Sequence, residues 1–115
     1  YHLGSLTNGN ADVQRLGIAD LFDFSLTAES VGRAKPHPRL FEEACRQSGV
    51  LPKELAHIGD EAGTDLAGGL AAGVNVIWMN RLEEPATAGI TPHAEIRDMT
   101  GLLTMLGLDI PQEMT

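Results

Sequence analysis

The sequence has few of the features that mark secreted and membrane proteins. Cys45 is the single cysteine among 115 residues, so no internal disulfide can form. A reducing compartment such as the cytoplasm is therefore expected. No apolar run approaches the roughly 18 residues that a transmembrane helix needs. The sequence has no basic segment followed by an apolar run, which would mark a signal peptide. It therefore indicates neither a membrane-spanning protein nor a secreted one.

Basic residues are also scarce. Lysine and arginine number 8 against 16 acidic residues, which gives a formal net charge of -8. Nucleic acids and anionic membranes attract clustered positive charge, so neither is expected as a partner. Hydrophobic residues make up 43% and charged residues 21%, the composition of a folded globular protein. A chain of this length corresponds to one small domain, covering residues 1–115.

Short apolar runs alternate with helical patterns along the chain. The most continuous run, VNVIWM at 74–79, is rich in β-branched residues and is typical of a buried parallel strand. Helices are expected to end at glycines such as Gly49 and Gly73. The expected strands are 2–6, 24–27, 55–58, 74–79 and 94–97, and the expected helices are 10–16, 39–48, 63–72 and 100–106. This alternation predicts an α/β fold with a mostly parallel sheet.

Three loops with chemically active side chains follow these strands and would share one edge of the sheet. The first contains Thr7, Asn8 and Gly9, and the second carries Lys35 directly before a proline. The third, at 59–65, has three carboxylates. Carboxylates suit Mg²⁺, and lysine, hydroxyl and backbone N–H groups suit phosphate oxygens. The set therefore predicts phosphoryl chemistry.

Each loop also has a simpler interpretation. Thr7-Asn8-Gly9 is a common turn sequence, and Lys35 in a proline-rich loop is commonly a solvated charge. Asp60 and Asp65 could simply lie at the start of a helix, where the helix dipole favours acidic residues. The order of the three loops and their shared position after strands favour the functional interpretation.

These residues resemble motifs of the haloacid dehalogenase superfamily, most of whose members are Mg²⁺-dependent phosphatases. LTNGN at 6–10, the lysine loop within 22–44, and HIGDEAGTDLAGGLAAGVNVIWMNR at 57–81 match its second, third and fourth motifs. The resemblance implies catalytic roles for Thr7 and Lys35, with Thr7, Asn8, Gly9 and Lys35 binding phosphate. Asp60 would bind Mg²⁺ directly, and Asp65 would bind it through water or orient Lys35. It also implies a Rossmann-like three-layer core, and a small phosphorylated metabolite as substrate.

One motif of this superfamily is absent. No DxDxT sequence occurs, although it supplies the aspartate that forms the aspartyl-phosphate. Asp23-Phe24-Ser25-Leu26-Thr27 is similar, but it lies between the second and third motifs and has Ser25 at the second aspartate position. We interpret it as an ordinary strand.

The chain is therefore expected to be the C-terminal part of a larger hydrolase. It begins at Tyr1 rather than methionine. The resemblance places the missing first strand centrally, between the strands that end at Thr7 and Asp60, and a cap domain would also be missing. A companion N-terminal segment of the same protein is thus the expected partner. The isolated chain is expected to be inactive, because it lacks the nucleophile.

Other reactive residues have structural interpretations. Glu61 and His37 are expected to be solvated, although Glu61 could support a metal site and His37 could reach a phosphate. His57 and Trp78 are interpreted as structural residues of strands. Cys45 lies on the apolar stripe of its helix and is expected in the core rather than as a nucleophile.

Two rival functions remain open at this level. A 2-haloacid dehalogenase of the same superfamily would use its aspartate to displace halide without a metal. A non-catalytic fragment or binding module would keep the fold without any chemistry. Asp60 and Asp65 favour the metal-using hydrolase, and the third interpretation depends only on the absent motif.

Overall fold

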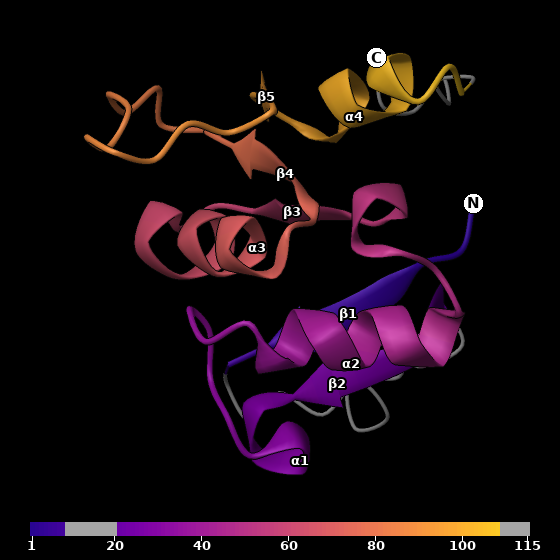
Figure 1. Cartoon of the computed structure of the whole chain (residues 1–115). Helices are drawn as coiled ribbons and strands as arrows, with labels where there is room; N and C mark the ends of the chain where they lie inside the picture. Colours follow the sequence, from indigo (N-terminus) through magenta and orange to yellow (C-terminus); the bar gives the residue numbers. More distant parts are fainter. Residues whose placement is uncertain (9–20, 109–115) are drawn as a thin grey trace.

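The computed structural model describes residues 1–8 and 21–108 of the chain (Figure 1). The described residues form five short strands, and helices separate the second strand from the third and the third from the fourth, as in an α/β fold. The strands are β1 (Gly4–Thr7), β2 (Phe24–Thr27), β3 (Ala56–Gly59), β4 (Asn75–Met79) and β5 (Ala94–Ile96). The helices are α1 (Ala28–Val31), α2 (Arg39–Ser48), the 3₁₀-helix η2 (Pro52–Glu54), the π-helix η3 (Ala62–Leu66), α3 (Ala67–Ala72) and α4 (Met99–Met105).

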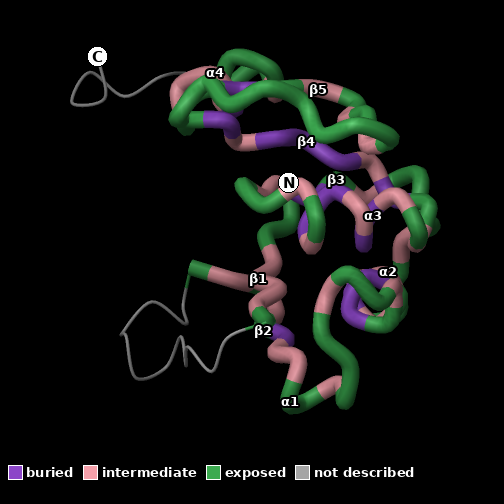
Figure 2. The backbone as a smooth tube through the Cα atoms, turned by 90° about the vertical axis from the view of Figure 1, so that its left-hand side faces the viewer, coloured by how far each residue is buried: buried purple, intermediate pink, exposed green. Residues whose placement is uncertain are grey.

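All strand pairs in the described part of the chain are parallel, which confirms the predicted fold class. β1 pairs with β2, with Leu6 opposite Leu26. β3 pairs with β4, and β4 with β5, with Ile58 opposite Ile77. β4 lies between its two neighbours and is buried along most of its length (Figure 2). The carboxyl ends of paired strands therefore lie on a common edge, as the sequence predicted.

The strands form two sheets instead of one. The first contains β1 and β2, and the second contains β3, β4 and β5. Among the described residues, no strand pairs with β1 on its side away from β2, or with β3 on its side away from β4. Both strands therefore have one edge whose backbone groups lack a strand partner within the described ranges.

Helix α2 packs against both sheets, because two different parts of its apolar stripe are buried. Leu40 and Ala44 pack with Leu26 of β2. Phe41 packs with Val76 and Trp78 of β4. All three helix residues are fully buried. The helix ends where Gly49 adopts a left-handed conformation with φ of 70°. α2 is thus the main element that joins the two sheets.

Most elements lie within one or two residues of their predicted positions. The third strand is displaced by one residue, and α4 begins at Met99 instead of residue 100. The predicted helix at 63–72 is a π-helix followed by α3. The four-residue α1 was not predicted; a capping box between Thr27 and Ser30 stabilises it. The helix predicted at 10–16 lies outside the described residues.

None of the described helices has the length and apolar character of a membrane span.

The double role of α2 leads to a prediction about stability. Phe41→Ala removes a fully buried ring from the core beside β4, and we expect a loss of about 3–5 kcal/mol in the free energy of unfolding. Urea-induced unfolding of the full-length protein measures this loss. Glu42→Ala, at the exposed neighbouring position, is the control and should change the stability by less than about 0.5 kcal/mol. Equal effects of the two substitutions would contradict the assignment of Phe41 to the core.

Candidate active site

The predicted loops meet at the carboxyl ends of β1 and β3. β1 ends at Thr7, which is half-buried, and β3 ends at Gly59, directly before Asp60. The lysine loop lies beside both strands. Its Lys35 ammonium donates a hydrogen bond to the carbonyl oxygen of Leu6 in β1, at 3.2 Å, and another to Asp65, which follows β3. The structure therefore brings together residues separated by about thirty positions in the sequence.

Asp65 is the centre of this cluster. Its Oδ1 accepts hydrogen bonds from Lys35 Nζ at 2.5 Å and from His57 Nε2 at 2.9 Å. Its Oδ2 accepts the backbone N–H of Glu61 at 3.2 Å. The residue is only 6% exposed. Both carboxylate oxygens are therefore engaged by protein donors, and this arrangement orients Lys35.

Burial of Asp65 and its hydrogen-bond partners have opposite effects on the pKa of its carboxyl group. Burial raises the pKa of the carboxyl, whereas the hydrogen bonds from His57 and Lys35 and their charges lower it. The hydrogen bonds and charges prevail, so the pKa of Asp65 lies well below its usual range. Asp65 is consequently a carboxylate, and it can hold Lys35 as an ammonium ion.

Local backbone geometry explains how Asp65 reaches this position. Asp65 belongs to the π-helix η3, a short π-turn in which the N–H of Leu66 donates to the carbonyl of Glu61. Gly59 lies against the Asp65 side chain so closely that a Cβ at position 59 would overlap it. Glycine at the end of β3 is therefore required for the carboxylate to fold back toward His57 and Lys35.

Asn8 holds the lysine loop in place. Its Nδ2 donates to the carbonyl oxygen of Lys35 at 2.9 Å, and its Oδ1 accepts the Lys35 N–H at 2.6 Å. The Lys35–Pro36 peptide bond is cis. The side-chain amide of Asn8 is engaged with the backbone of the lysine loop, and phosphate binding by Asn8 stays a prediction. Gly9, the third residue of that predicted group, lies outside the described residues.

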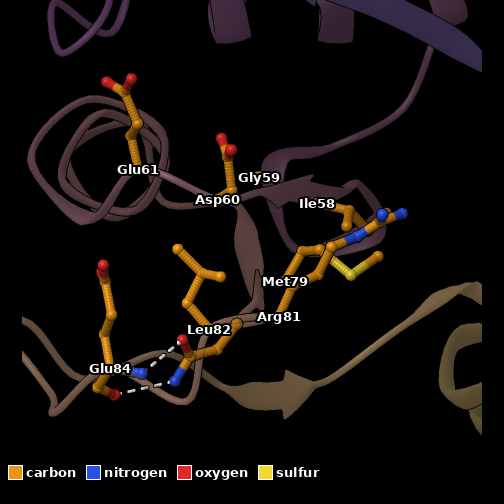
Figure 3. Close-up of a pocket in the computed structure, with 9 residues that line it drawn as sticks. Ile58, Gly59, Asp60, Glu61, Met79, Arg81, Leu82 and Glu84 are labelled. Carbon is orange, nitrogen blue, oxygen red and sulfur yellow. Dashed lines mark hydrogen bonds between the residues drawn. The ribbon is translucent and has the colours of Figure 1, made fainter.

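Asp60 differs from Asp65 in being exposed. It lines a pocket of about 760 Å³ at the end of β3, and Figure 3 shows its carboxylate pointing away from the side chains of Met79, Arg81 and Leu82. Trp78 Nε1 donates to the Asp60 backbone oxygen at 3.2 Å. Within the described ranges, no hydrogen bond or ion pair engages the Asp60 carboxylate. This carboxylate fits a Mg²⁺ ion that takes one or two protein ligands and completes its shell with water and phosphate.

Asp65 fits a metal less well than Asp60, because both its oxygens are engaged and it is buried. Among the described residues, no group of three or more histidine, cysteine or acidic side chains could hold a metal by itself. Asp60 is thus the residue here that could bind the ion directly. Further ligands would have to come from water, substrate or another segment.

The remaining candidates take peripheral positions. Glu61 is exposed and lines the pocket beside Asp60, and its carboxylate accepts a hydrogen bond from Thr64. His37 is exposed and accepts the backbone N–H of Arg39. Cys45 is half-buried against the main core cluster. His57, which the sequence analysis interpreted as a structural residue, lies within hydrogen-bond distance of Asp65. Its position before the acidic loop was visible, but its distance from Asp65 depends on the π-turn.

The ionised, buried Asp65 predicts acid sensitivity. Because its folded pKa lies below the unfolded value, its contribution to stability is present above the usual aspartate pKa of about 3.9 and is lost as pH falls toward the folded pKa. Urea unfolding of the full-length protein between about pH 6 and pH 2 measures this loss. Asp65→Asn should be less stable at pH 6 and should show a shallower decline.

Glu43 offers a matched control, because Arg46 lowers its pKa to about 2 at the protein surface. Water screens this exposed pair, so Glu43→Gln should retain most of the acid sensitivity. An unchanged pH dependence in Asp65→Asn would show that the buried carboxylate does not control it.

Comparison with known sequences supports a relationship that the geometry suggests. A family model described as haloacid dehalogenase-like hydrolase matches residues 1–73. The chain is 37% identical to a phosphoserine phosphatase of Thermus thermophilus, over 84% of this chain and 41% of that protein. It is 31% identical to the 5-amino-6-(5-phospho-D-ribitylamino)uracil phosphatase YigB of Escherichia coli, over 92% of this chain and 46% of that protein. The chain thus spans less than half the length of these relatives.

Solved structures show the same likeness. A 2-haloacid dehalogenase from Pseudomonas syringae superposes with a TM-score of 0.88 at 43% identity, covering 93% of this chain and 46% of the other. A HAD phosphatase from Thermococcus onnurineus superposes with a TM-score of 0.82 at 32% identity, covering 93% and 51%. The matching family model, the relatives and the parallel α/β architecture agree, and the chain belongs to the haloacid dehalogenase-like hydrolase family.

Proposed function

We propose that this chain is part of a Mg²⁺-dependent phosphatase that acts on a small phosphorylated metabolite. The observation that carries the proposal is the position of Lys35, held between the Leu6 carbonyl and the buried Asp65 carboxylate at the carboxyl edge of the strands. An ammonium ion fixed in this way is an electrostatic contact for a phosphate group. The exposed Asp60 supplies the carboxylate for the metal.

The charges around the pocket favour a metal-using reaction. Asp60, Glu61 and Glu84 line it, and Arg81 is the single cationic residue among the lining residues in the described part of the chain. A phosphate anion near these carboxylates is repelled unless a cation neutralises them. Bound Mg²⁺ would supply that neutralisation. Thr7, at the end of β1, would donate its hydroxyl to a phosphate oxygen.

The phosphatase relatives support this choice of reaction, and the nucleophile belongs to the same proposal. Phosphoryl transfer through an aspartyl-phosphate needs an aspartate that this sequence does not supply in a DxDxT motif. We place that aspartate on a segment outside this chain. The cytoplasmic location suggested by the single Cys45 is also part of the proposal.

A 2-haloacid dehalogenase is the second candidate, favoured by the similarity to the Pseudomonas syringae structure. Its substrate would also be an anion, so Lys35 could have a comparable role. The two candidates differ in their need for a metal, because halide displacement from carbon gives Mg²⁺ no phosphate to bind. The accessible Asp60 carboxylate favours the phosphatase.

The break between the sheets supports a proposal about the partner. β1 and β3 each have an unpaired edge within the described ranges, and Lys35 links their carboxyl ends. A single extended segment, parallel to both strands, would satisfy the backbone groups of both edges. Its carboxyl end would then lie beside Thr7, Lys35 and Asp60, where a nucleophile is needed. We assign this position to an N-terminal segment of the same protein.

The proposed function predicts a metal-dependent defect in Asp60→Asn. In the full-length protein, we expect kcat/KM for a phosphomonoester at fixed Mg²⁺ to fall about 10²–10³-fold, because the Mg²⁺ that would contact the reacting phosphate loses a protein ligand. Glu61→Gln, at the neighbouring exposed position, is the control and should fall much less. Isothermal titration with Mg²⁺ should show weakened binding in Asp60→Asn alone. Halide release from a 2-haloacid without added metal would instead establish the dehalogenase.

The partner proposal predicts that residues 1–115 do not form a stable monomer alone. Each buried backbone group left unpaired costs about 1–3 kcal/mol, against a total stability of about 5–15 kcal/mol for a typical domain. Intact mass under denaturing conditions, compared with native mass, should reveal a second or longer polypeptide that carries an Asp-x-Asp sequence. Co-expression with that segment should restore cooperative unfolding and phosphatase activity. A stable, cooperatively folded monomer of 12.3 kDa would contradict the proposal.

A further inference from the structure

His57 occupies an unusual position for a histidine on a buried strand. It lies in β3, is 9% exposed, and packs edge-on against the Phe41 ring of α2 with the ring centroids 4.9 Å apart. Its Nε2 lies 2.9 Å from Asp65 Oδ1. Because a carboxylate can only accept, the hydrogen lies on Nε2, and His57 donates. Packing and hydrogen bonding thus fix the ring from two sides.

The hydrogen bond from His57 shares its acceptor with the lysine. Asp65 Oδ1 receives both His57 Nε2 and Lys35 Nζ, and Oδ2 receives the backbone of Glu61. With His57 absent, one donor to this carboxylate would be lost, and the group could turn about its side-chain bonds. The direction in which Oδ1 holds Lys35 therefore depends on His57.

The donor count of Lys35 shows what this orientation controls. An ammonium group has three N–H donors. One is directed to the Leu6 carbonyl and one to Asp65 Oδ1. These two contacts leave a single N–H, and the positions of both acceptors determine its direction. Leu6 is fixed by the β1–β2 pairing, so Asp65 is the acceptor whose orientation can change.

We propose that His57 is a positioning residue, which locks the Asp65 carboxylate and thereby aims the remaining N–H of Lys35 at the anionic group of the substrate. This role rests on the proposed function for the identity of that anion. The orientation of Lys35 itself does not depend on the choice between phosphatase and dehalogenase. A residue that only fills space beside Phe41 could be apolar, so the donor on His57 is the feature to test.

Three substitutions separate the donor from the packing. His57→Gln keeps an N–H donor with a reach similar to that of Nε2. His57→Met has a similar length without a donor. His57→Asn has a donor too short to reach Asp65, and it keeps a polar side chain if His57→Met proves unable to fold. Thermal unfolding of each full-length variant verifies that it is folded.

The first readout is the rate at which trinitrobenzenesulfonate labels Lys35, followed by peptide mass spectrometry. Lys53, the other lysine of the chain, is exposed and serves as the internal reference. We expect His57→Met and His57→Asn to label Lys35 several-fold faster than the wild type relative to Lys53, and His57→Gln to match the wild type. Equal labelling of Lys35 in all folded variants would overturn the proposal, whatever reaction the protein catalyses.

The second readout is the binding of inorganic phosphate, measured by competitive inhibition or calorimetry. Loss of one hydrogen bond to a charged group predicts weakening of about 10-fold or more in His57→Met and His57→Asn, with recovery to within a few-fold in His57→Gln. Equal weakening in His57→Gln and His57→Met would also overturn the proposal. A wild type that binds no phosphate but shows the expected Lys35 labelling pattern would contradict the phosphatase function alone.

Discussion

The site depends on one buried carboxylate and on the three donors that it accepts. Asp65 receives Lys35 from the loop before α2, His57 from β3, and the Glu61 backbone from the start of its own π-turn. Burial of a charge is costly unless it is paired and hydrogen-bonded. The donors therefore must remain in place for Asp65 to remain ionised. This requirement connects the lysine loop, the end of β3 and η3 through one set of hydrogen bonds.

The same contacts join the two sheets of the described part of the chain. Lys35 bonds to β1 through Leu6 and to the β3 side through Asp65. Asn8, directly after β1, fixes the backbone of Lys35. In the core, α2 packs against both sheets through Leu40 and Phe41. The carboxyl ends of β1 and β3 are consequently held near each other although no described strand lies between them.

Much of this arrangement follows from local sequence signals. Strand β4 could be predicted because its β-branched and apolar residues are continuous, and α2 because Leu40, Phe41 and Ala44 recur at helical spacing. Lys35, Asp60 and Asp65 could be selected because parallel strands bring their carboxyl ends to one edge. These signals act within a few residues or through a general property of the fold.

The features that could not be predicted depend on distances between side chains. His57 was interpreted as structural because nothing in its neighbours indicates that a π-turn returns Asp65 to within 2.9 Å of its ring. The hydrogen bonds between the Asn8 amide and the Lys35 backbone, 27 residues away, were likewise not predicted. The division of the sheet also depends on pairing between distant strands, which periodicity within one strand does not reveal.

The separation of Asp60 from Asp65 shows how one short loop can serve two electrostatic needs. A carboxylate that binds a metal must be accessible and keep its oxygens available, whereas one that orients a lysine must be desolvated so that the attraction between the charges is strong. Asp60 precedes the π-turn and is exposed; Asp65 lies within it and is buried. Exchanging these environments would leave a metal ligand without access and a lysine without a fixed direction. The turn therefore gives opposite environments to two identical side chains, and the proposed division of their roles follows from that difference.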